Sequence, residues 1–195
     1  MPTPATKTEV PTSNSALFAA GKSVRLNVMG NSMYLSPSPQ KPQWLALAGF
    51  LAATFLVAGV SALFTAQSIP TWYATLAKPS FNPPNSIFGP VWTLLYGLMA
   101  IAAWLIWKRP PSPLRSRALL LFWVQLALNF AWSLIFFGQR QIGWGLIDIL
   151  MLWLTIVLIC IMFFRLSKPA GSMFLPYLAW VSFASVLNSE IWRLN

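Results

Sequence analysis

Five long stretches of this chain are almost free of charged side chains, and this restricts its fold more than any other feature. The stretches are residues 44–77, 79–107, 118–139, 141–164 and 169–192. Asp148 and Glu190 are the only charges inside them. A helix needs about 20 mostly apolar residues to cross the hydrocarbon core of a bilayer. The sequence therefore predicts an all-α integral membrane protein with five transmembrane helices, at about 44–66, 87–107, 118–137, 142–164 and 172–192.

The composition excludes an ordinary soluble protein. Only 8% of the residues are charged, whereas soluble domains carry roughly 25%. A net charge of +10 would suggest nucleic acid binding in a soluble protein. Here the cations flank the apolar stretches, where they direct membrane topology and contact lipid headgroups. We therefore expect membrane lipid, and no nucleic acid, as a partner.

The distribution of these cations predicts an orientation. Of the 13 Lys and Arg residues, ten fall on one side of the predicted helices, and only Lys78, Arg140 and Arg193 fall on the other. Cytoplasmic loops carry the excess of Lys and Arg, so the N-terminal side is expected inside. A bacterial cell membrane is favoured, and a mitochondrial or other organelle membrane stays open.

Residues 1–43 differ in kind from the rest. They are rich in Ser, Thr, Pro and Asn and contain no apolar run long enough to span a membrane. We interpret them as a polar, disordered tail, with a targeting segment as the alternative, because Ser-rich, acid-poor leaders resemble transit peptides. Residues 44–195 are then the membrane domain.

The chain offers little material for metal or hydrolytic chemistry. It has no His and a single Cys, Cys160, so a His-based metal site and an internal disulfide are excluded. Its three carboxylates, Glu9, Asp148 and Glu190, are far apart in the sequence. We predict no metal site, and Cys160 is interpreted as a small packing residue.

The connection between the first two predicted helices is long and unusual. Residues 72–96 contain four prolines, several large aromatic side chains and one charge, that of Lys78. Proline fixes φ, so this segment is expected to be a stiff cap over the bundle that leads into the second helix. The residues assigned to this lid are Trp72, Lys78, Pro79, Pro83 and Pro84.

Polar residues inside the predicted helices are candidates for function, because they are costly in a membrane. Gln125, Asn129 and Ser133 share one face of the third helix, beside Trp132. Interhelical hydrogen bonding and pocket lining are equally compatible with this pattern. Asp148 needs a partner, and we expect a structural hydrogen bond to another helix rather than a proton relay.

Four motifs point to a known family. They are W-Y-A-T-L-A-K-P-S-F-N-P-P (72–84), F-G-P-V-W-T-L-L-Y (88–96), N-F-A-W-S-L-I-F-F-G-Q-R-Q-I-G-W (129–144) and P-Y-L-A-W-V-S-F-A (176–184). Over about 44–195 the chain resembles the TspO/MBR family, which comprises the tryptophan-rich sensory proteins of bacteria and the translocator protein, or peripheral benzodiazepine receptor, of mitochondria.

This resemblance implies a five-helix bundle, commonly a homodimer, with a pocket beneath the loop between the first two helices. It implies a porphyrin of the protoporphyrin IX type as ligand and no obligatory cofactor. Carried over by position, the ligand-binding residues would be Tyr73, Trp92, Tyr96, Asn129, Trp132, Asp148, Ile149, Trp180 and Ala184. In bacterial members, tryptophans at the positions of Trp92 and Trp180 are associated with light-dependent porphyrin breakdown.

The sequence departs from the family at one place. The sterol-recognition pattern of animal members requires a Tyr near the end of the last helix, where this chain has Glu190. Such short sterol motifs are weak patterns, and this one is broken. Sterol handling is therefore not expected.

The resemblance and the residues together predict a tetrapyrrole-binding sensory or regulatory membrane protein. Aromatic faces suit a flat macrocycle, and the absence of His removes the commonest axial ligand of haem. Two alternatives stay open. One is a transporter of porphyrins or other hydrophobic ligands, and the other is a light-dependent porphyrin-degrading enzyme that uses Trp92 and Trp180 as catalytic candidates.

Overall fold

The structure, a computed structural model, describes residues 26–28, 31–33 and 43–195. Contacts divide the chain into two units, Met1–Lys41 and Pro42–Asn195. In the first unit the described residues form a small antiparallel sheet of β1 (Leu26–Val28) and β2 (Asn31–Met33). The prediction of a disordered or targeting segment over 1–43 otherwise lies outside the described residues, and it stays a prediction.

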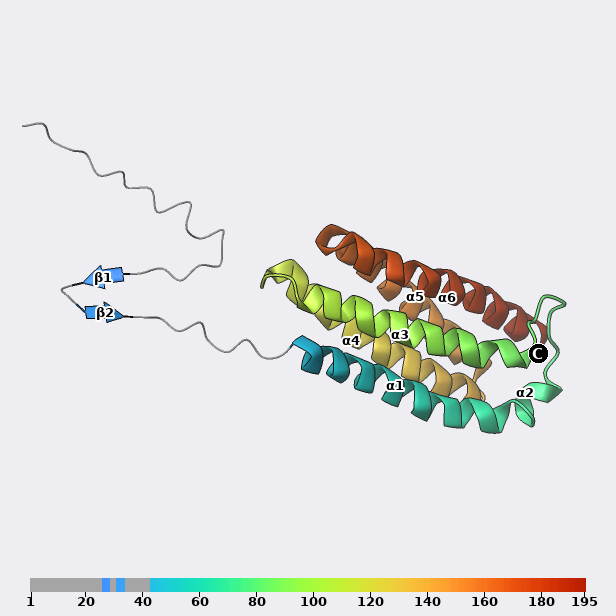
Figure 1. Ribbon diagram of the computed structural model, residues 1–195. Coiled ribbons are helices and arrows are strands. Elements are labelled where there is room, and N and C mark those ends of the chain that lie inside the picture. The colour runs from blue at the N-terminus through green and yellow to red at the C-terminus, as the bar shows by residue number, and fades with distance from the viewer. Residues whose placement is uncertain (1–25, 29–30, 34–42) are drawn as a thin grey trace, which may run out of the picture. The chain divides into compact units, whose positions relative to one another are not determined.

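The second unit is a bundle of five long helices that lie side by side (Figure 1). They are α1 (Gln43–Ser68), α3 (Phe88–Trp107), α4 (Pro113–Ser133), α5 (Ile142–Leu166) and α6 (Lys168–Leu194). All five are long and apolar enough to cross a membrane, α4 together with the π-helix η2 (Leu134–Gly138) that continues it. The predicted all-α membrane bundle is therefore confirmed.

Several helices extend beyond the apolar spans that hydropathy marks. α4 begins at Pro113 rather than near 118, because Ser112 Oγ accepts a hydrogen bond from the Arg115 N–H at 3.2 Å and Pro113 stands in the first turn. α6 begins at Lys168, so the predicted connection over 165–171 shrinks to Ser167 alone. A capping side chain and a first-turn proline set the start of α4, and a first-turn proline sets the start of α6. An average of hydropathy over a span detects neither signal.

The loop between α1 and α3 contains more regular structure than predicted. It forms α2 (Trp72–Thr75) and, just before α3, the 3₁₀ helix η1 (Asn85–Ile87), with Pro79, Pro83 and Pro84 between them. The connection from η2 to α5 is short, as expected, and it turns at Arg140, whose φ is 59°. The loop and this turn lie at the same end of the bundle, since α1, η2 and α6 all end there (Figure 1).

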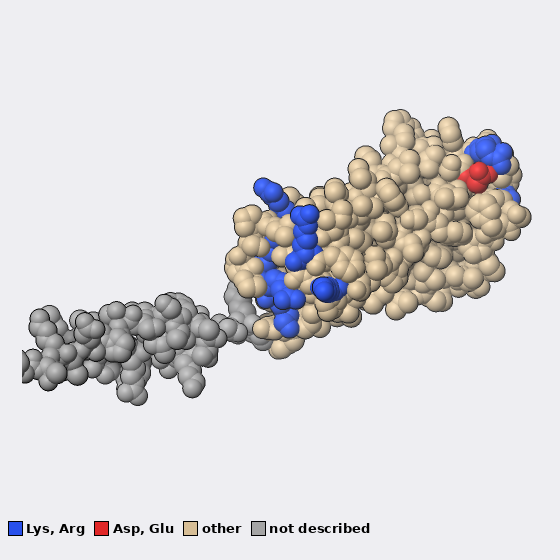
Figure 2. Space-filling view, turned by 90° about the horizontal axis from the view of Figure 1, so that it is seen from above, with Lys and Arg blue, Asp and Glu red and all other residues tan. Residues whose placement is uncertain are grey.

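Apart from the buried Asp148, the described charges gather at the two ends of the bundle (Figure 2). One end carries Lys108, Arg109, Arg115, Arg117, Arg165 and Lys168. The opposite end carries Lys78, Arg140, Arg193 and Glu190. On the face shown, the middle of the bundle has no charged side chain, as a lipid-facing belt requires.

The packing of α5 on α6 depends on one glycine. A Cβ added at Gly171 would lie 2.5 Å from Cγ of the Phe164 ring, whereas a Cβ added at Gly97 of α3 would meet nothing within 4 Å. We expect Gly171→Ala to destabilise the bundle by about 1–3 kcal/mol, because overpacking forces side chains and backbone to shift. Gly97→Ala should not lower the midpoint of thermal unfolding in detergent, because alanine fits there and favours a helix more than glycine does. Equal midpoints for the two variants would contradict this account of the α5–α6 contact.

Candidate functional site

A cavity of about 320 Å³ opens in the bundle close to the long loop. Side chains of α1, α3, α4 with η2, and α6 line it, together with Tyr73 of α2 and Asn85 of η1. Among the described residues, α5 contributes none of the lining, and no lining residue is an Asp, Glu, Lys or Arg. The site is therefore a neutral, mostly apolar chamber with a few polar groups, which is typical of small-molecule sites.

Aromatic rings form two walls of this chamber. On α3, Trp92 packs against Tyr96 with ring centroids 5.6 Å apart, because residues four apart share a helix face. On α4, Trp132 stacks on Phe136 of η2, with centroids 5.2 Å apart and planes at 20°. These flat faces leave room for a planar ring system to stack against them.

The π-helix η2 brings two consecutive phenylalanines to the site. Phe136 and Phe137 are both buried, both line the cavity, and their rings are 4.9 Å apart in an edge-to-face contact. π-helical turns are rare and frequently lie at functional sites. Both residues lie within the 129–144 motif but were not predicted as site residues, and the irregular turn that directs both inward is not visible in the sequence.

A chain of buried hydrogen bonds joins three helices at the cavity. The Tyr96 hydroxyl donates to Asn129 Oδ1, and Asn129 Nδ2 donates to the Tyr177 hydroxyl at 3.0 Å. The Tyr177 hydroxyl in turn donates to Gln125 Oε1 at 3.0 Å. Tyr96 and Asn129 line the cavity while Gln125 and Tyr177 do not, so the polar face of α4 both joins helices and lines the pocket.

A second polar contact fixes the indole of Trp132. Its Nε1 donates to Asn188 Oδ1 of α6 at 3.1 Å, and Asn188 Nδ2 donates to the carbonyl of Ile142 at 3.0 Å. Trp132 and Asn188 both line the cavity, whereas Ile142 begins α5. The orientation of one aromatic wall is thereby tied to two neighbouring helices.

Tyr73 is the part of the loop that reaches the site. Its side chain is only 3% exposed, and its ring packs 5.7 Å from that of Phe137. The Tyr73 hydroxyl donates to Asn82 Oδ1 at 2.8 Å, and Lys78 Nζ lies 4.8 Å from the centre of its ring. Burial raises the pKa of Tyr73 to about 12, because the charged phenolate would be poorly solvated there.

The other predicted lid residues, Trp72, Lys78, Pro79, Pro83 and Pro84, do not line the cavity. Lys78 Nζ donates to the carbonyls of Ala74 at 3.3 Å and of Leu76 at 3.2 Å. Trp72 packs on Phe136, with ring centroids 5.6 Å apart. These two side chains therefore shape and anchor the loop, while Tyr73 covers the chamber.

The structure brings six of the predicted binding residues together at the cavity. They are Tyr73, Trp92, Tyr96, Asn129, Trp132 and Ala184. Trp180 is not a lining residue, since its ring packs 5.9 Å from that of Phe88 and 5.7 Å from that of Phe183. Ile149 is 2% exposed and lies in the core, because α5 is behind the lining helices.

Asp148 also lies away from the cavity lining. Its side chain is 4% exposed, and among the described residues Oδ2 has no hydrogen-bond partner. The expectation of a structural hydrogen bond to another helix is therefore wrong. The family resemblance implied a place for Asp148 at the site, but the rotation of α5 directs it into the packing between helices.

Residues of α1 and the end of α6 complete the lining, although they were not predicted as site residues. On α1 they include Ser61 and Thr65, four residues apart, beside Ala58 and Ala62. On α6 they include Leu187 and Ile191. Small and hydroxyl side chains that share one face of α1 were the available signal, although they favour close helix packing just as well.

One side of the chamber is open. Ala62 and Ala66 of α1, and Gly89 and Thr93 of α3, line the cavity and are also exposed on the surface. All four side chains are small, so α1 and α3 leave a gap between them close to the loop.

Sequence comparison identifies the family to which this bundle and cavity belong. A profile of the TspO/MBR family matches residues 50–193. The chain belongs to the TspO/MBR family. It is similar to the tryptophan-rich protein TspO of Archaeoglobus fulgidus, with 42% identity over 151 residues that cover 77% of this chain and 97% of that protein.

Two further TspO/MBR relatives come from other groups of organisms. The translocator protein of Homo sapiens is 38% identical over 157 residues, which cover 79% of this chain and 92% of that protein. The tryptophan-rich sensory protein of Cereibacter sphaeroides is 37% identical over 152 residues, which cover 78% and 92%. The chain is thus a multi-pass membrane protein that spans nearly the whole length of these TspO/MBR relatives.

Proposed function

We propose that this TspO/MBR protein binds flat tetrapyrroles of the protoporphyrin IX type in its cavity and acts as a sensory or regulatory binding protein. The observation that carries the proposal is an uncharged chamber whose walls are the rings of Trp92, Trp132 and Tyr96. Aromatic faces bind planar rings through dispersion and offset stacking. The polar groups of Asn129 and Asn188 at the same surface offer the few contacts that would fix the orientation of a ligand.

The lining also determines how such a ligand would lie. Ligand sites measure about 300–1,000 Å³, so a chamber of about 320 Å³ is at the small end of that range. The part of its lining that the structure describes has no cation to pair with a carboxylate, and an unpaired charge is costly to bury. The ring would therefore enter the chamber while the acid groups stay in the gap between α1 and α3, or at the rim beside Lys78. Without any His in the chain, we propose a free-base ligand and no obligatory cofactor.

A titration of protein in lipid nanodiscs with protoporphyrin IX tests this function through the absorbance shift of the bound ligand. We expect Trp92→Ala to weaken binding about tenfold, which corresponds to ~1.4 kcal/mol of lost stacking and contact area. Trp144→Ala is the matched control, because Trp144 is 65% exposed and is not a lining residue. Equal affinity of wild type and Trp92→Ala would show that the cavity is not the porphyrin-binding site.

We also propose a bacterial cell membrane as the location, with the more basic end in the cytoplasm, and a homodimer as the assembly. The six cations at the α3–α4 and α5–α6 connections support this orientation.

The outward face of α1 supports the dimer, because Gly49 and Gly59 are exposed and a Cβ at either would meet nothing within 4 Å. Chemical cross-linking in native membranes that yields only monomer would contradict the dimer.

A further inference from the structure

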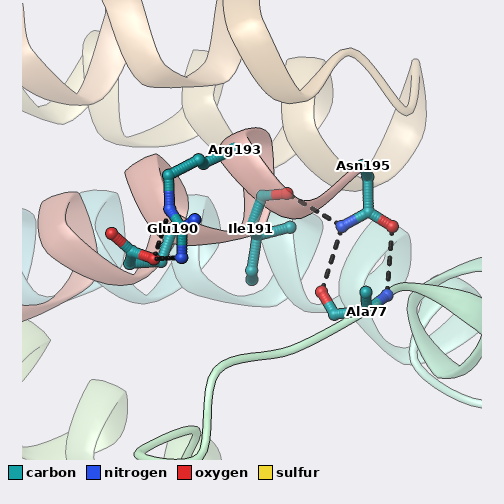
Figure 3. Close-up of polar contacts among 5 residues, drawn as sticks. All are labelled: Ala77, Glu190, Ile191, Arg193 and Asn195. Atoms are coloured by element: carbon teal, nitrogen blue, oxygen red, sulfur yellow. Dashed lines mark hydrogen bonds and ion pairs between the residues drawn. The ribbon is translucent and has the colours of Figure 1, made fainter.

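Asn195, directly after α6, is joined to the long loop by its side-chain amide. Asn195 Oδ1 accepts the Ala77 N–H at 3.0 Å, and Asn195 Nδ2 donates to the Ala77 carbonyl at 3.0 Å (Figure 3). Nδ2 also donates to the Ile191 carbonyl at 2.8 Å, on the preceding turn of α6. The amide therefore exchanges both hydrogen bonds with one residue, as two paired residues of an antiparallel sheet do.

This contact provides the hydrogen bonds that the backbone of Ala77 does not form within the loop. Ala77 follows α2 and forms no backbone-to-backbone hydrogen bond in the described part of the chain. Both of its backbone polar groups are instead paired by Asn195, which is 118 positions away in the sequence. Because Ala77 lies four residues after Tyr73, the contact holds the loop close to the ring that covers the cavity.

The helix end that holds the loop also belongs to the site. Ile191, whose carbonyl accepts from Asn195, lines the cavity and is in the same buried cluster as Tyr73 and Phe136. A single turn of α6 therefore supports the amide, one wall of the chamber and the packing beneath Tyr73. Movement of Ala77 away from α6 would break its two hydrogen bonds to Asn195 and draw the loop away from this turn.

We propose that Asn195 is a positioning residue, which pairs with Ala77 and so keeps the loop, and with it Tyr73, in place over the cavity. The effect on a ligand rests on the proposed binding function, but the effect on the loop does not. The loop can therefore be tested without any ligand.

The first measurement is hydrogen–deuterium exchange of the full chain in nanodiscs, without ligand. We expect Asn195→Ala to speed the exchange of the Ala77 amide about tenfold, while α3 and α4 exchange as in wild type, because a lost hydrogen bond exposes only the loop. Asn195→Asp should show a smaller increase, because its carboxylate still accepts from the Ala77 N–H but cannot donate to the two carbonyls.

Arg193→Ala is the matched control on the same turn. Arg193 pairs with Glu190 through Nη2 and Oε2 at 2.7 Å and has no hydrogen bond to the loop (Figure 3). Arg193→Ala should leave the exchange rate of the Ala77 amide unchanged. The proposal would be overturned if Asn195→Ala did not change this rate, or if Arg193→Ala increased it equally.

The second measurement is the dissociation rate of protoporphyrin IX from the same variants. Asn195→Ala should release the ligand several-fold faster than wild type and Arg193→Ala do. Faster exchange with an unchanged dissociation rate would show that the loop does not cover the ligand, and it would overturn the positioning role. If wild type binds no porphyrin, the proposed function fails, while the exchange measurement still decides whether Asn195 holds the loop.

Discussion

Replacement of Asn129 by leucine is expected to destabilise the bundle by about 2–3 kcal/mol and to weaken porphyrin binding. Asn129 joins the hydroxyls of Tyr96 on α3 and Tyr177 on α6, and its side chain is 2% exposed. Leucine has a similar volume but removes the acceptor to which the Tyr96 hydroxyl donates, and the loss of a buried hydrogen-bond partner costs about 1–3 kcal/mol. Tyr177 keeps its bond to Gln125, so the main loss is at Tyr96. Thermal unfolding in detergent measures the effect.

A double substitution separates this loss from a general disturbance of packing. When both partners of a buried hydrogen bond are removed, the unsatisfied group disappears with them. Tyr96→Phe in the Asn129→Leu background should therefore restore part of the lost stability, and the two changes should not be additive. Additive losses would show that the hydrogen bond between Tyr96 and Asn129 is not the source of the effect.

Replacement of Tyr73 by alanine is expected to weaken porphyrin binding at least tenfold by opening the cover of the cavity. The Tyr73 ring packs on Phe136 and Phe137, with centroids 6.4 and 5.7 Å away. Truncation of a buried aromatic ring typically costs about 3–5 kcal/mol, and here the cost should fall on loop closure rather than on the five-helix bundle. Hydrogen exchange over the loop and ligand titration measure the two consequences.

Tyr73→Phe is the control, because it keeps the ring and removes only the hydroxyl that donates to Asn82 Oδ1 at 2.8 Å. The loss of that bond should cost about 1 kcal/mol and change ligand affinity by less than the alanine variant does. Unchanged affinity in Tyr73→Ala would mean that the loop is not part of the binding site.

Much of the bundle could be predicted from the sequence, because the signals for it are local. Each span is apolar over about 20 residues and must satisfy its own backbone hydrogen bonds in lipid, so it forms a helix whatever its neighbours are. The helix ends were less predictable, since Ser112 and Pro113 lengthen α4 through capping rather than through hydropathy. The prolines of the loop likewise predicted stiffness but not the short helix α2.

The residues that line the cavity could be predicted only in part, because the rotation of each helix decides which of its side chains face the cavity. Trp92 and Tyr96 share a face of α3, Asn129 lies on a face of α4, and both faces point into the chamber. Asp148 belongs to α5, which packs against α4 and α6 and stays behind the lining. Ser61 and Thr65 reach the chamber from α1, on a face that also suited close packing.

By itself, the sequence determined that this chain crosses a membrane five times and covers one end of the bundle with a stiff, aromatic loop. Apolarity, proline content and helical spacing are properties of short segments, and they need no partner to act. The tertiary structure alone decided that α1, α3, α4 and α6 enclose the cavity and that Asn195 holds Ala77. The physical reason is that both depend on how separate helices rotate and pack against one another. That packing is determined jointly by side chains that are distant in the sequence.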